Sequence, residues 1–192
     1  MLETIRRNKF NIILVASIVA IFLLLPSLAN AIEDFKNYNK YLRDGATYYR
    51  ELRNTTLISI IEFLCLIIAD VFLLVMGRKR SIDKTLIMFA IILYYASDSI
   101  DPIYDFIKND DYSSIYSVII NVIIASFAII ALSNDRYLFA SLVLLLIDAA
   151  FALVSSFGGS AVGLSKLILI LVLMISIYFS SKSNELTDEY YQ

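Results

Sequence analysis

Long apolar runs separated by short polar segments are the main pattern of the 192-residue chain. A bilayer core about 30 Å thick requires a helix of about 20 mainly apolar residues, and each run meets or approaches that length. Backbone polar groups must be paired inside hydrocarbon, and the runs lack the alternation of barrel strands, so each run is predicted to be a helix. The predicted spans are 10–32, 56–76, 85–107, 115–133, 137–157 and 161–181. The pattern predicts an all-α integral membrane protein, a single bundle over residues 1–192 in contact with the lipid bilayer.

The first run also has the features of a secretory signal. Basic residues precede it, Pro26 is predicted to break its helix, and Ala29-Asn30-Ala31 has the small-residue pattern of a cleavage site. Removal of residues 1–31 would reduce the six spans to five. Retention of the run and its removal both place residue 32 outside the cell, so the orientation of the later spans is the same.

Residues 33–55 form the one sizeable segment between runs, and we expect it to be extracytoplasmic. Apolar and aromatic side chains recur there at helical spacing, which predicts a short amphipathic outer helix, interrupted by Gly45. Such a helix can lie in the headgroup layer, cap the bundle, or meet a neighbouring protomer. The residues of the predicted face are Phe35, Tyr38, Leu42, Tyr49 and Leu52.

Basic residues beside the spans predict the orientation of the chain. The run Arg78-Lys79-Arg80 between the second and third spans is the strongest indicator, and basic residues also precede the first span and follow the sixth. Placing these segments inside makes both termini cytoplasmic. Residues 182–192 are then a short acidic cytoplasmic tail, either a frayed terminus or a docking segment for a partner.

Composition excludes several classes of protein. Hydrophobic residues make up 59% of the chain and the mean hydropathy is +0.75, which is unlike a soluble domain or a disordered chain. A formal net charge of -2 gives no basic field for nucleic acid. Histidine is absent and Cys65 is the single cysteine, so we expect no disulfide within the chain, no Cys/His metal site and no cofactor.

Ionisable side chains inside the predicted spans are the most informative feature, because each central charge costs about 2.5–3.5 kcal/mol on insertion scales. Their helical spacing predicts a polar seam inside the bundle, and Lys166 is placed to reach Asp148 or Asp101. Pro102 is expected to kink the third span or to end its regular helix. The predicted seam consists of Glu62, Asp70, Asp98, Asp101, Asp105, Asn121, Asp148 and Lys166.

Three interpretations of the seam stay open: hydrogen bonding between helices by neutral acids, a pathway for a cation, and salt bridges to another protomer or subunit. No recognised catalytic constellation accompanies the acids, so we expect no enzyme activity. The sequence favours a non-enzymatic multi-pass membrane subunit, a sensor or scaffold, that acts as a homo-oligomer or with a separately encoded protein partner. A bacterial inner-membrane component of a defence-type effector system fits that description. The alternative is a small cation channel or transporter with an acidic intramembrane pathway.

Overall fold

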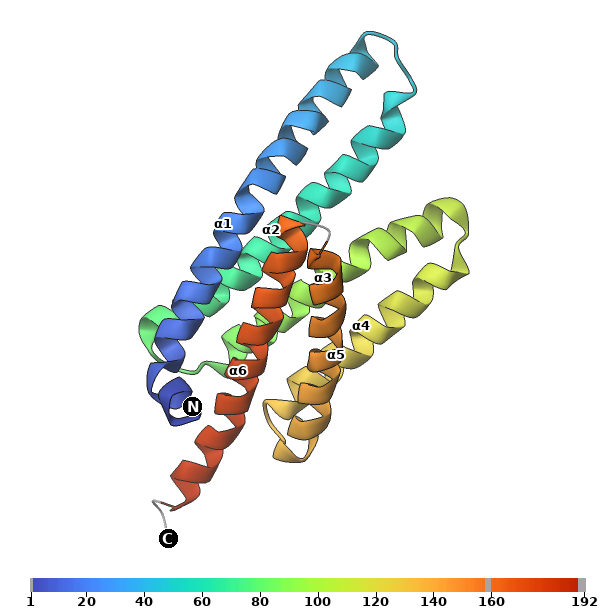
Figure 1. Ribbon diagram of the computed structural model, residues 1–192. Coiled ribbons are helices and arrows are strands. Elements are labelled where there is room, and N and C mark those ends of the chain that lie inside the picture. Colours follow the sequence, from blue (N-terminus) through green and yellow to red (C-terminus); the bar gives the residue numbers. More distant parts are fainter. Residues whose placement is uncertain (1, 158–159, 190–192) are drawn as a thin grey trace.

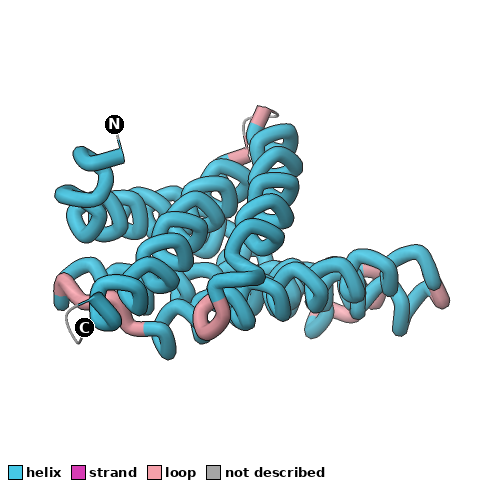
Figure 2. The backbone as a smooth tube through the Cα atoms, turned by 90° about the horizontal axis from the view of Figure 1, so that it is seen from below, coloured by secondary structure: helices cyan, strands magenta, loops and turns pink. Residues whose placement is uncertain are grey.

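The computed structural model describes residues 2–157 and 160–189, with side chains for residues 8–157 and 160–181. Within those ranges the chain is all-helical, as predicted, and contains no strand (Figure 2). Six helices in the described part of the chain are long and apolar enough to cross a membrane. In chain order the elements are α1 (Leu2–Arg43), α2 (Tyr49–Lys79), α3 (Lys84–Asn109), α4 (Tyr112–Ala131), the short 3-10 helix η1 (Asp135–Tyr137), α5 (Leu138–Ser156) and α6 (Ala161–Glu189).

Each predicted span corresponds to one helix, but the boundaries differ. The helix α1 is much longer than the predicted 10–32, and α4 ends at Ala131, before the predicted end at 133. The backbone of the predicted tail 182–192 continues α6 as far as Glu189, and residues 190–192 lie outside the described residues. The helix α3 continues through Pro102 to Asn109.

The helices pack mainly as antiparallel neighbours. Figure 1 shows α1 and α2 side by side as one long hairpin, and α3 and α4 as a second hairpin that diverges from it. The helix α6 packs against α1 on one side and α5 on the other. Leu73, Ile91 and Leu169 are fully buried where these helices meet, so apolar side chains from α2, α3 and α6 share one core.

Side-chain caps fix the starts of two helices. Asp83 accepts hydrogen bonds from the backbone N–H groups of Thr85 and Leu86 at the start of α3, and Asp111 accepts from Ser113 at the start of α4. Such caps satisfy N–H groups that have no partner within the helix. The Ser113 hydroxyl and N–H, helped by the Ser114 hydroxyl, lower the pKa of Asp111, because they stabilise its carboxylate.

The prediction that Pro26 breaks the first helix is wrong, because α1 passes through it without interruption. Proline removes one backbone hydrogen bond, which a helix tolerates where its neighbouring turns are held by packing. Leu24 and Ala31 on either side of Pro26 are buried, whereas Pro26 itself is exposed. Packing on the buried face therefore keeps the helix regular on the opposite face.

The prediction of a separate outer helix over residues 33–55 is also wrong. Residues 33–43 complete α1, a turn follows in which Gly45 has a φ of 89°, and α2 begins at Tyr49. The rings of Tyr38 and Tyr49 stack with centroids 5.7 Å apart, and Tyr41 lies 4.8 Å from Tyr49. The five residues of the predicted face are all partly buried, because the two halves of the segment pack against each other at the tip of the hairpin.

Candidate functional site

An ion pair between α3 and α6 is the centre of the polar contacts inside the bundle. The Lys166 ammonium donates a hydrogen bond to Asp98 Oδ1 at 2.5 Å. The two side chains are 26% and 18% exposed, so most of both is removed from solvent. The sequence predicted Asp148 or Asp101 as the partner of Lys166. Asp98 is the partner instead, because it lies on the face of α3 that approaches α6.

Asp148 joins this ion pair from α5. The Tyr95 hydroxyl donates a hydrogen bond to Asp148 Oδ2 at 2.9 Å, and Asp148 also interacts with Tyr94 and, electrostatically, with Asp98 and Lys166. Both tyrosines are buried, and their rings meet edge to face with centroids 4.8 Å apart. Two rigid aromatic side chains of α3 therefore hold the carboxyl group of α5 in place.

Glu62 brings α2 into the same group. It interacts electrostatically with Lys166, Asp101 and Asp98. Glu62 is partly buried and Asp101 is exposed, so the group extends from the interior of the bundle to its surface. We call this group the polar centre; it consists of Glu62, Asp98, Asp101, Asp148 and Lys166.

The remaining three residues of the predicted seam lie outside the polar centre. Asp105 accepts a hydrogen bond from Asn109 near the end of α3, and Asn121 of α4 donates one to the Ser99 hydroxyl at 3.2 Å. Asp70 is fully buried, and neither of its carboxyl oxygens has a hydrogen-bond partner in the structure. Helical spacing placed these residues on polar faces of their own helices, but each face meets a different neighbour.

The sequence interpretation missed Tyr95 as a member of the polar network. The sequence does contain an indication of this role. A tyrosine three residues before Asp98 lies close to the same helix face, and a buried hydroxyl requires a hydrogen-bond partner. The partner, Asp148, is more than fifty residues away along the chain. Only the packing of α3 against α5 could identify it.

The polar centre has a surplus of carboxyl groups over its single ammonium group. One lysine can balance one carboxylate, so the other carboxyls are neutral, hydrated, or balanced by a cation. No group of three or more acidic or cysteine side chains in the described ranges has the arrangement of a metal site. The arrangement therefore suits cross-linking of four helices by polar contacts, or interaction with a weakly coordinated cation.

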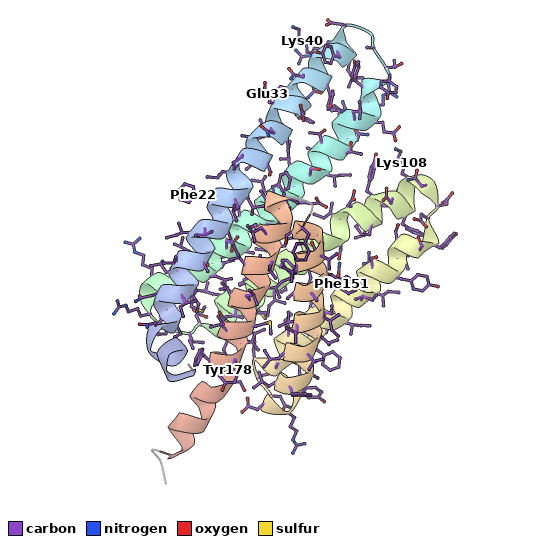
Figure 3. All side chains as sticks on the ribbon, in the orientation of Figure 1. Phe22, Glu33, Lys40, Lys108, Phe151 and Tyr178 are labelled. Atoms are coloured by element: carbon purple, nitrogen blue, oxygen red, sulfur yellow. The ribbon has the colours of Figure 1, made fainter. Side chains whose placement is uncertain are left out.

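A second ion pair joins α3 to α2, two of the helices of the polar centre, at their ends. Lys108, at the end of α3, pairs with Glu51, near the start of α2, and Figure 3 labels Lys108 beside the end of α3, in the space between the two hairpins. The side chains of Lys108 and Glu51 are 32% and 65% exposed, so the pair is largely in solvent. It connects the tips of the hairpins without closing off the polar centre.

Comparisons with protein-family models, with curated proteins and with solved structures give no match.

Proposed function

We propose that this chain is a multi-pass membrane protein with six spans, both termini in the cytoplasm, and a setting in the bacterial inner membrane. Support comes from the large apolar side chains on the outside of the bundle. Phe22, Phe139 and Phe151 are each more than two-thirds exposed, and Figure 3 shows Phe22 pointing away from the other helices. Exposed apolar surface of this extent suits contact with lipid, and polar residues gather in the interior instead.

Within the membrane we propose a non-enzymatic subunit, a sensor or scaffold, that acts through the hairpin of α1 and α2. The length of α1 carries this proposal. Its 42 residues span about 63 Å, about twice the hydrocarbon thickness. Residues 33–43 of α1 and 49–55 of α2 therefore extend outside the bilayer as an arm.

The arm presents surface that its own packing does not use. Tyr48 is 78% exposed at its tip, and Tyr41 is exposed beside it. Tyrosine offers large contact area with a polar group at its end, and it is enriched in protein interfaces. We propose that the arm contacts a second copy of the chain or a separately encoded partner.

Cross-linking from the outside tests this proposal in intact cells. In a Cys65→Ala chain, we expect an Asp44→Cys variant to react with a membrane-impermeant thiol-to-amine cross-linker and to form one adduct of defined mass, a dimer or a complex with one partner. Adding Tyr48→Glu should reduce the adduct at least several-fold, because a charge disrupts an apolar contact. Lys79→Cys, at the opposite end of α2, is the control and should stay unreacted.

Two results would contradict the proposal. Reaction of the Lys79→Cys variant in sealed cells would reverse the orientation. Labelling at position 44 without any defined adduct, combined with a monomeric mass in nanodiscs, would show that the arm does not support assembly.

The second candidate function is a small cation channel or transporter. The surplus of carboxyl groups in the polar centre favours it, because rings or clusters of acidic side chains attract cations in membrane pathways. Lys166 would then be a tethered cation that a mobile cation displaces from Asp98.

Neutral substitutions separate the two candidates. We expect Asp101→Asn and Asp148→Asn to preserve folding, because an amide keeps the size and most hydrogen bonds of the carboxyl group. If the polar centre conducts, these variants should lose at least tenfold of the Na⁺, K⁺ or proton flux measured in proteoliposomes, whereas Asp83→Asn, at an exposed cap, should not. Equal flux in all variants, or none in the unmodified protein, argues against the channel.

A further inference from the structure

The hairpin of α1 and α2 follows a regular seven-residue pairing along its length. At one end Tyr49 stacks on Tyr38. At the other end a Cβ atom added to Gly77 would lie between the backbone oxygen of Phe10, at 3.1 Å, and the backbone nitrogen of Leu14, at 3.0 Å. Tyr49 and Gly77 are separated by the same number of residues as Phe10 and Tyr38, and that number is a multiple of seven, as in an antiparallel coiled coil.

Stepping by seven between these two ends assigns the intermediate layers. Thr56 pairs with Ala31, Phe63 with Leu24, and Asp70 with Ser17. Burial agrees with this assignment, because every one of these side chains is buried or partly buried. The layers at both ends rest on contacts in the structure, so the layer that contains Asp70 follows from the register between them.

Asp70 and Ser17 are the polar pair of the hairpin. Both are fully buried, and neither the Asp70 carboxyl oxygens nor the Ser17 hydroxyl has a hydrogen-bond partner in the structure. A buried polar group without a partner is unfavourable, and a buried carboxylate without a cation is more so. The register therefore makes these two groups neighbours across the hairpin; they are not hydrogen-bonded to each other in the structure, but each can supply what the other lacks.

Charged neighbours that could stabilise an ionised Asp70 are absent from its surroundings within the described ranges. On α1 the sequence has no ionisable residue between Lys9 and Glu33. The ring of Phe72, two residues after Asp70, contacts the ring of Phe89, which shows the part of α3 that lies beside this part of α2. The closest ionisable residues along α2, α3 and α6 are Glu62, Cys65, Arg78, Lys84, Tyr94 and Lys166, and Lys166 is paired with Asp98.

We propose that Asp70 is a buried proton-binding site, a neutral carboxylic acid whose proton is donated to the Ser17 hydroxyl across the hairpin. The ligand is a proton, and the pair forms the polar layer that fixes the register of α1 against α2. A single polar layer in an otherwise apolar coiled coil has this effect, because any other register leaves the polar groups unpaired. This inference is independent of the function proposed for the arm and the polar centre.

Infrared spectroscopy of the full-length protein in nanodiscs at neutral pH tests the site. The unmodified protein should show the carbonyl band of protonated carboxyl groups, and Asp70→Asn should remove one component of it. Ser17→Ala should keep the band but shift it to higher frequency, because the hydrogen bond is lost. Asp83→Asn is the control: Asp83 is exposed, so this variant should leave the band unchanged.

Each other outcome contradicts a defined part of the proposal. A spectrum unchanged by Asp70→Asn shows that Asp70 is ionised, and an unshifted band in Ser17→Ala excludes Ser17 as its partner. If Asp70→Asn does not fold, Asp70→Glu serves instead, and its band should move to the frequency of a glutamic acid. A short thiol cross-linker tests the register in a Cys65→Ala chain: it should join Ser17→Cys to Asp70→Cys, and failure to join them overturns the pairing.

Discussion

Replacing Lys166 with methionine should lower the free energy of unfolding by about 3–5 kcal/mol, because the change leaves Asp98 as an unbalanced buried charge. Any of Glu62, Asp101 and Asp148 that is ionised adds to the loss, because its negative charge repels that of Asp98 once the ammonium group is gone. Reversible unfolding in mixed micelles measures the change. The destabilisation should diminish as the pH falls, since protonation of the carboxyls removes the repulsion.

The ion pair at the hairpin tips provides a matched control for this prediction. Lys108→Met removes the partner of Glu51, but that pair is largely exposed, so the expected change is about 0–1 kcal/mol. Asp98→Asn added to Lys166→Met should restore much of the lost stability, because it removes the stranded charge. An effect of Lys166→Met as small as that of Lys108→Met would show that the polar centre is well hydrated and does not depend on its lysine.

Helix positions were predictable from the sequence because they depend on local properties. A run of about 20 apolar residues specifies a helix in any apolar surroundings. The predicted spans consequently fall on the six long helices. Helix ends were less predictable: α1 continues to Arg43 and α2 begins at Tyr49, because residues 33–55 pack against themselves across a tight turn.

Pro26 shows why local rules failed in α1. The rule that proline ends a helix describes an isolated segment, whereas this proline lies on the exposed face of a helix that is held by α2 along its length. The tyrosine face of residues 33–55 illustrates a related ambiguity. Helical spacing placed Tyr38 and Tyr49 on one apolar face, but spacing alone cannot distinguish a headgroup layer from a partner helix.

The polar residues were predictable individually but not as a constellation. Each acid could be assigned to a helix face, yet which faces meet depends on crossing geometry between segments far apart in sequence. Lys166 reaches Asp98 from α6, and Tyr95 reaches Asp148 across α3 and α5. Asp70 has the same helical period as Glu62, but neither of its carboxyl oxygens has a hydrogen-bond partner in the polar centre.

The close approach of α1 to α2 at Gly77 gives the second large expected effect. Gly77→Val should destabilise the protein by about 3 kcal/mol, the upper end of the range for overpacking. A Cβ atom at this position would lie 3.0 Å from the backbone nitrogen of Leu14 and 3.1 Å from the backbone oxygen of Phe10. Both atoms belong to the helix backbone, so they cannot move aside as a flexible side chain would, and α1 must shift as a unit.

Reversible unfolding of Gly77→Val in mixed micelles measures this effect, with Ala96→Val as the control. Ala96 is exposed on α3, so a valine there should change stability by no more than about 0.5 kcal/mol. Because Gly77 is one end of the seven-residue pairing, the displacement should also reduce cross-linking between cysteines at positions 17 and 70. A Gly77→Val variant with unchanged stability and cross-linking would show that the two helices can separate at this end without disturbing the layers beyond it.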